Sequence, residues 1–253
     1  MIRSMHGTGT RSPTRSAGRH PVMTYTLIGV CFLIFLLGPA SGFVPAYGTG
    51  EALFHEQTGH FHRWGVVPRT LWSGRPRPLA TPFTALFLHG NWLHLLGNLL
   101  FLFVFGEMAE RRMGAARFLL FYVIVGYAAM LCYAAAYPDS SETLVGASGA
   151  ISGVLGAFLY LFPRARVTSV LPFLWFLPLR FPAWAVLVFW LTLQWLAARR
   201  DTEGPGVAYL AHVVGFTLGF LYAWLRFRTP RSSRVSEPAP AATGRTPDEG
   251  ITP

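Results

Sequence analysis

Three polar clusters interrupt the long apolar stretches of this 253-residue sequence. The first contains His94 and Asn98, the second Ser148 and the third His212. A serine hydroxyl becomes a strong nucleophile when a base removes its proton, and histidine is the side chain best suited to that task near neutral pH. Attack on a carbonyl creates an oxyanion, which donors such as His94 and Asn98 can stabilise. These residue types predict acyl-transfer chemistry, provided that the fold brings them together.

The composition excludes an ordinary soluble domain. Hydrophobic residues make up 52% of the chain and charged residues only 13%, whereas soluble domains carry about a quarter charged residues. All 21 basic residues are arginine, against 11 acidic residues, which gives a net charge of +10. The arginines lie near both ends and between the apolar stretches, so they suit a lipid surface and we expect no nucleic-acid partner.

Six stretches without Asp, Glu, Lys or Arg approach the length of about 20 apolar residues that a membrane-spanning helix needs. Backbone in lipid must satisfy its own hydrogen bonds, so these stretches should be helices. The first is predicted to be retained rather than cleaved as a signal peptide, because its apolar character continues to Val44. A shorter stretch, 167–179, carries Pro172 and Pro178 and is predicted to be a loop or interfacial segment. The predicted helix cores are 24–44, 86–107, 116–137, 146–163, 182–198 and 207–227.

Arginine placement predicts that both termini are cytoplasmic, because fifteen arginines then lie inside and six outside. The longest external connection, about 45–82, mixes aromatic residues with arginines and is either a membrane-interface segment or a plain external loop. Residues 1–20 and 229–253 are rich in Ser, Thr, Pro, Gly and Arg, and are predicted to be disordered tails. The predicted fold is therefore an all-α membrane protein, with a six-helix domain over 21–228.

This topology places the three polar clusters at one depth. The second, fourth and sixth predicted helices all run from outside to inside, and each cluster lies in the outer half of its helix. Glycines provide the means of approach, because small residues on helix faces let transmembrane helices pack closely. We expect the fourth and sixth helices to bring His212 within hydrogen-bond distance of Ser148. The glycines concerned are Gly146, Gly149, Gly153 and Gly156 on one helix, and Gly215 and Gly219 on the other.

Other roles for these residues are open from the sequence. Ser148 could bond back to its own helix, and His212 could simply bridge two helices. A metal site is disfavoured because no carboxylate or cysteine joins His89 and His94 at ligand spacing, so we expect no metal and no cofactor. The outer halves of the three helices contain no Asp or Glu, which favours a Ser-His dyad over a triad with an acidic member. Cys31 and Cys132 lie in apolar stretches and are interpreted as buried thiols.

The three clusters resemble those of the rhomboid intramembrane serine proteases, over about residues 82–225. The resemblance implies a six-helix rhomboid-like bundle with a water-accessible cavity, in which Ser148 is the nucleophile and His212 the general base. His94 and Asn98 would then stabilise the oxyanion. The matching segments are Leu93-His94-Leu95-Leu96-Gly97-Asn98, Gly146-Ala147-Ser148-Gly149, and Ala211-His212 followed by Gly215 and Gly219.

Two further features bear on the resemblance. Glu110 and Arg112 resemble a structural charged motif of the family, although ordinary charges on the inner face would look the same. Family members often carry a Trp-Arg pair in the first loop, whereas this sequence has Arg63-Trp64 in the reverse order. That departure concerns the shape of the loop and leaves the dyad unaffected.

The function implied by the resemblance is a serine endopeptidase of a bacterial inner, or plasma, membrane. Its partners would be the lipid bilayer and transmembrane protein substrates, whose helices should unwind easily near the cut. One alternative is a non-catalytic rhomboid-like protein that binds membrane clients, but such proteins usually lack the serine or the histidine. A small transporter is the other alternative, and the scarcity of buried Asp and Glu counts against it.

Overall fold

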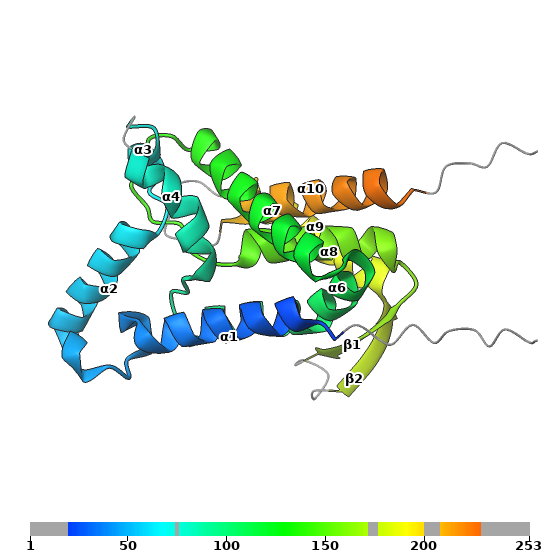
Figure 1. The fold of residues 1–253 in the computed structure, drawn as a ribbon, viewed down its shortest axis with the longest axis horizontal. Coiled ribbons are helices and arrows are strands. Elements are labelled where there is room, and N and C mark those ends of the chain that lie inside the picture. The colour runs from blue at the N-terminus through cyan, green and yellow to red at the C-terminus, as the bar shows by residue number, and fades with distance from the viewer. Residues whose placement is uncertain (1–19, 74–75, 172–176, 200–207, 229–253) are drawn as a thin grey trace, which may run out of the picture.

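The computed structural model describes residues 20–73, 76–171, 177–199 and 208–228. The predicted tails therefore lie outside the described residues, apart from His20. The described chain is almost entirely helical (Figure 1). Its helices are α1 (Val22–Leu37), α2 (Gly50–Trp64), α3 (Pro68–Leu71), α4 (Pro76–Thr84), α5 (Trp92–Phe101), α6 (Glu107–Met113), α7 (Ala115–Ala136), α8 (Ser148–Leu161), α9 (Ala183–Ala198) and α10 (Tyr209–Phe227). Short turns and strands complete it, namely η1 (Pro39–Ser41), η2 (Pro45–Tyr47), η3 (Ala85–Phe87), the π-helical turn η4 (Leu102–Gly106), β1 (Arg166–Leu171) and β2 (Leu177–Pro182).

Each of the six predicted helix cores coincides with an apolar helix. Three helical stretches are long and apolar enough to cross a membrane, within the part of the chain that is described: Trp92–Met113, which joins α5, η4 and α6, together with α7 and α10. The other three apolar helices, α1, α8 and α9, have 14 to 16 residues. The chain is thus a multi-pass helical membrane protein, and the crossing of the bilayer by all six helices stays a prediction.

Proline and glycine decide where the helices end. The prediction that the first helix reaches residue 44 is wrong, since α1 ends at Leu37 and Pro39 follows, and the residue before a proline avoids the helical conformation. Similarly, α8 begins at Ser148 rather than at residue 146. Gly146 has φ +126°, a backbone conformation that residues with a Cβ rarely adopt.

The connection over about 45–82 is not an irregular loop, because it contains α2, α3 and α4. Its position on the external side stays a prediction. None of the side chains of α2 is buried, and Phe54 and Trp64 are exposed on it. In Figure 1, α2 projects from the side of the molecule, away from α8 and α10. A 15-residue helix that mixes charges with aromatic residues escapes a search for long charge-free stretches.

The described residues of the segment 167–179, predicted to be a loop or an interfacial segment, form strands of a two-stranded sheet. Residues 172–176 lie outside the described residues. Strands β1 and β2 pair antiparallel, with Arg166 opposite Pro182 and Leu171 opposite Leu177. Proline is compatible with a strand when its missing N–H faces a sheet edge, and in a two-stranded sheet every strand is an edge strand. Pro178 therefore did not prevent strand pairing, and Pro172 lies outside the described residues.

Helix α8 forms the centre of the bundle. Ten of its 14 residues are buried, and it contacts α5, α6, α7, α9 and α10. A Cβ added at Gly215 would collide with the Gly149 carbonyl, and one added at Gly219 would collide with the Gly153 carbonyl. These pairs also show that α8 and α10 run parallel. The close glycine-mediated approach predicted for the two helices is confirmed.

Glu110 fastens the beginning of α1 to α6. Its carboxylate is buried and accepts hydrogen bonds from the backbone N–H groups of Met23 (2.9 Å) and Thr24 (2.7 Å) and from the Thr24 hydroxyl (2.7 Å). It thereby caps α1, which has no side-chain cap from its own N-cap residue. Arg112 lies 4.8 Å above the Phe227 ring at the end of α10. The two described chain ends therefore lie at the same end of the bundle (Figure 1).

Substituting Glu110 tests this capping role. Glu110→Gln removes the charge that three buried donors share, and hydrogen bonds to a charged group contribute more than neutral ones. We expect a loss of about 2–3 kcal/mol in the free energy of unfolding, measured by chemical denaturation in detergent. The matched control is Glu107→Gln, whose partly exposed carboxylate pairs with Arg111 and should contribute under about 1 kcal/mol. Equal effects of the two variants would contradict the role.

A second stability test concerns the glycine contact. Gly219→Ala places a methyl group against the backbone of Gly153, which forces the two helices apart, and overpacking of this kind costs about 1–3 kcal/mol. Gly29→Ala on α1 is the control, because a Cβ there meets nothing within 4 Å. Thermal unfolding followed by circular dichroism should show a lower midpoint for Gly219→Ala alone. An unchanged midpoint would mean that the helices can separate without cost.

Candidate active site

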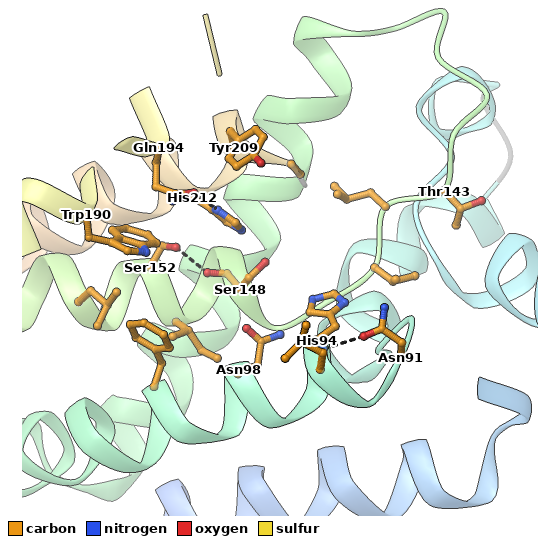
Figure 2. Close-up of a pocket in the computed structure, with 18 residues that line it drawn as sticks. Asn91, His94, Asn98, Thr143, Ser148, Ser152, Trp190, Gln194, Tyr209 and His212 are labelled. Atoms are coloured by element: carbon orange, nitrogen blue, oxygen red, sulfur yellow. Dashed lines mark hydrogen bonds between the residues drawn. The ribbon is translucent and has the colours of Figure 1, made fainter. Parts of the chain in front are cut away.

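A cavity of about 640 Å³ lies between α5, α8, α9 and α10 (Figure 2). All four residues predicted from the sequence line it: Ser148, His212, His94 and Asn98. The fold therefore brings the three polar clusters to one place. Apolar side chains, among them Phe101, Ile151, Leu155 and Trp190, form much of the remaining wall.

Ser148 is the first residue of α8 and is half-buried. Its hydroxyl makes no hydrogen bond to any described residue, so the alternative that Ser148 bonds back to its own helix is wrong. It is the hydroxyl of Ser152, one turn later, that donates to the Ser148 carbonyl at 2.7 Å (Figure 2). The first backbone N–H groups of an α-helix lack intrahelical acceptors and lie at the positive end of its dipole. The free hydroxyl thus lies beside free amide donors.

His212 lies in the first turn of α10 and is only 7% exposed. Its ring contacts the rings of Trp190 and Tyr209, with centroids 6.0 and 6.4 Å away. Its Nδ1 atom is 2.7 Å from Oε1 of Gln194 on α9. An amide oxygen only accepts hydrogen bonds, so with this amide orientation Nδ1 carries the proton and Nε2 of the neutral ring is an acceptor.

The expectation that His212 reaches hydrogen-bond distance of Ser148 is not met in this structure. The two side chains point toward one another across the cavity in Figure 2, but the hydrogen bonds of the described residues do not include one between them. The His212 ring is held instead by Gln194. Hydrogen bonds between catalytic groups are often long before substrate binds, so this separation is compatible with proton transfer.

His94 presents a donor to the region around Ser148. The side chain of Asn91 caps α5 by accepting from the His94 backbone N–H at 2.8 Å. The Gly90 N–H donates to Nδ1 of the His94 ring in a long hydrogen bond of 3.5 Å. The proton of the neutral ring is then on Nε2. A Cβ added at Gly146 would lie 2.7 Å from this Nε2 atom and 3.7 Å from the Ser148 hydroxyl oxygen, so donor and hydroxyl flank the same glycine.

Asn98 follows His94 by one helical turn on the same face of α5. Its Nδ2 atom is buried and has no hydrogen-bond partner within the part of the chain that the structure describes. Leaving a buried donor unpaired lowers the stability of a fold by about 1–3 kcal/mol. An unpaired donor of this kind is therefore a candidate for binding a ligand. An acceptor that enters the cavity can take up this donor.

Sequence reasoning missed Gln194, Trp190, Tyr209 and Asn91, all of which line the cavity. A signal was present for Gln194. Within the charge-free stretch 181–198, only Thr192 and Gln194 are polar, and an amide in an apolar helix usually has a partner. Gln194 lies on the fifth predicted helix, whereas the three polar clusters lie on the second, fourth and sixth.

Comparison with known proteins agrees with the resemblance. The Rhomboid domain matches residues 76–229. The mitochondrial Rhomboid protein 1 of Saccharomyces cerevisiae is 34% identical over 54% of this chain and 39% of its own length. Two Bacillus subtilis proteins are also similar: the putative rhomboid protease YdcA is 38% identical over 56% of this chain and 63% of its own length, and the rhomboid protease GluP is 42% identical over 30% and 15%.

The similarity has a defined extent. The chain covers less than two thirds of the length of each of these three relatives. The domain match, by contrast, runs from the beginning of α4 to just beyond α10 and takes in every helix that lines the cavity. Because this match covers more than half of the sequence and contains all three polar clusters, the chain belongs to the rhomboid family.

Proposed function

We propose that this protein is a serine endopeptidase that cleaves transmembrane segments of other membrane proteins through a Ser148–His212 dyad. The observation that carries the proposal is a serine hydroxyl that makes no hydrogen bond to a described residue and lines the same cavity as a buried histidine. The other ring nitrogen of that histidine is already engaged by an amide oxygen. This leaves the nitrogen on the far side of the ring to act as a base.

The oxyanion would be stabilised by donors that have no other partner. Asn98 contributes its unpaired Nδ2–H groups, and His94 contributes Nε2–H from beside Gly146. The backbone N–H of Ser148 adds a donor at the beginning of α8. Donors oriented before the reaction stabilise the developing charge without reorganisation, which makes them effective in a site with apolar walls.

The reaction would proceed in two acyl transfers. The Ser148 oxygen attacks the peptide carbonyl carbon while its proton moves to Nε2 of His212. Collapse of the tetrahedral oxyanion breaks the C–N bond, and His212 gives the proton to the leaving amine. Water then attacks the carbonyl carbon of the acyl-enzyme and gives its proton to Nε2 of His212. Collapse of the second oxyanion breaks the ester bond to the Ser148 oxygen, which takes the proton back from His212, and the product with the new carboxyl end leaves. The cavity is large enough to admit that water beside the acyl group.

The substrate class and the membrane are also proposals. A cavity surrounded by apolar helices is reached most easily by a chain that already lies in the bilayer, which supports transmembrane protein substrates. Two of the similar proteins are named as rhomboid proteases of a bacterium, which supports a bacterial plasma membrane. Another is named as mitochondrial, so the family itself is not confined to that membrane.

Labelling with a fluorescent fluorophosphonate tests for an activated serine. The protein purified in mild detergent should label, Ser148→Ala should not label, and His212→Ala should label at least about 100-fold more slowly, because general-base help contributes about 10²–10⁴-fold. Ser152→Ala is the matched control. Its hydroxyl lines the same cavity but is bonded to its own helix, so this variant should label like the parent.

Two results would overturn the proposal. Labelling that survives in Ser148→Ala would place the reactive group elsewhere. Absence of labelling in the parent, from a preparation with full helical circular dichroism, would favour the non-catalytic protein that binds membrane clients. Capture of a membrane protein by a Ser148→Ala variant would then be the decisive measurement.

The unpaired amide of Asn98 predicts opposite effects on activity and stability. Asn98→Leu removes one oxyanion donor, which costs about 10²–10³-fold in turnover, measured with a transmembrane reporter substrate. The same substitution removes a buried unpaired donor, so the unfolding midpoint should stay the same or rise. Asn91→Ala is the contrasting variant: it removes the cap of α5 and should cost about 1 kcal/mol of stability. A joint fall of activity and stability in Asn98→Leu would indicate a structural role.

A further inference from the structure

Gln194 is a polar side chain of α9 that the reaction outlined above leaves without a role. It is half-buried, it lines the cavity, and its Oε1 atom is 2.7 Å from Nδ1 of His212 (Figure 2). Among the described residues, this is the only hydrogen bond made by the His212 ring. Gln194 therefore binds Nδ1, the ring nitrogen of His212 that lies on the side away from Ser148.

We propose that Gln194 is a positioning residue that holds His212 in the Nδ1–H tautomer, with Nε2 unprotonated and directed toward Ser148. This inference rests on the proposed function of the Ser148–His212 dyad. Neutral imidazole carries one proton on either of its two nitrogens. Only the ring with a free Nε2 can accept the Ser148 proton, so a partner that fixes the tautomer raises the reactive fraction of the enzyme.

The described lining of the cavity offers no carboxylate for this task. No Asp or Glu occurs among the described residues that line it, and a buried carboxylate would be costly in an apolar wall. An amide oxygen fixes the same tautomer without a net charge. Its partial negative charge also favours the imidazolium that forms when Nε2 takes the proton, although less strongly than a carboxylate would.

Helix α9 holds the ring in a second way. Trp190 precedes Gln194 by one turn, so the two side chains share one face of α9, and both line the cavity. The Trp190 ring lies 6.0 Å from the His212 ring with an angle of 31° between their planes. The hydrogen bond and the ring contact together fix both the tautomer and the orientation of the His212 ring.

The opposite orientation of the Gln194 amide predicts the other tautomer of His212. If Gln194 donated from Nε2 to Nδ1 of His212, the neutral ring would carry its proton on Nε2 and could not act as a base toward Ser148. The two orientations cannot be distinguished by heavy-atom positions alone, because the oxygen and nitrogen of an amide occupy equivalent places. The ¹⁵N resonances of the ring distinguish them, because protonated and unprotonated nitrogens resonate far apart.

The first experiment measures the tautomer in the full chain, labelled with ¹⁵N-histidine in detergent micelles, with the His212 signals identified by their absence in His212→Ala. We expect Nδ1 protonated and Nε2 unprotonated in the parent and in Gln194→Glu, which keeps the acceptor oxygen. Gln194→Leu should show a mixture of tautomers. The matched control is Thr192→Val, two residues away on α9, because the exposed Thr192 hydroxyl bonds only to the Val188 carbonyl of its own helix.

The second experiment measures the rate of fluorophosphonate labelling of the same variants. Loss of one neutral hydrogen bond corresponds to about a tenfold effect, so Gln194→Leu should label about tenfold more slowly. Gln194→Glu should recover the parent rate, and Thr192→Val should match it. Circular dichroism and the unfolding midpoint establish that each variant is folded, so a slower rate can be assigned to the histidine.

The outcomes separate the two claims. A parent His212 that carries its proton on Nε2, or a folded Gln194→Leu variant with parent tautomer and parent rate, overturns the role of Gln194. A parent that shows the Nδ1–H tautomer but never labels removes the proposed peptidase function, and the loss of that tautomer in Gln194→Leu would still establish that Gln194 fixes the His212 ring.

Discussion

The contact between the backbones of α8 and α10 sets the distance between the helices that carry Ser148 and His212. A Cβ at Gly215 or Gly219 of α10 would collide with the backbone carbonyl of Gly149 or Gly153 of α8. In lipid there is no hydrophobic driving force between helices, so close packing of small residues becomes a main source of association. The position of α8 at the centre of the bundle, with ten of 14 residues buried, follows from the same contact.

Several polar groups of the cavity have no hydrogen-bond partner among the described residues. Ser148 has a free hydroxyl, and Asn98 has an unpaired Nδ2 atom. The His94 ring turns Nε2 toward Gly146 rather than toward a protein acceptor. A buried donor such as Nδ2 of Asn98 weakens a fold, because it gives up hydrogen bonds to water without a replacement among the described residues. The cost is offset elsewhere, notably where Glu110 satisfies three donors at the beginning of α1.

Helices α5, α8 and α10 carry one polar cluster each. The fourth helix around the cavity, α9, carries Gln194, which orients His212. The bilayer explains why each helix has so few polar side chains, since every polar side chain in an apolar helix is costly. The amide of Gln194 does with a neutral group what a buried carboxylate does in a Ser-His-Asp triad. A single polar side chain in an apolar helix of this bundle is therefore a strong indication of a functional contact.

The sequence by itself determined the family, the apolar helices and four of the residues that line the cavity, namely Ser148, His212, His94 and Asn98. Charge-free stretches and polar clusters can be read from residues that are neighbours in the chain. The rest depended on contacts between distant segments. The helix α2 and the β1–β2 pair carry no long apolar signal, and the true beginning of α8 depends on the positive φ of Gly146. Only the tertiary structure revealed the hydrogen bond from His212 to Gln194, and that none joins His212 to Ser148 among the described residues. Hydrogen bonds between helices require positions fixed to within a fraction of an ångström, which packing sets and helical periodicity does not.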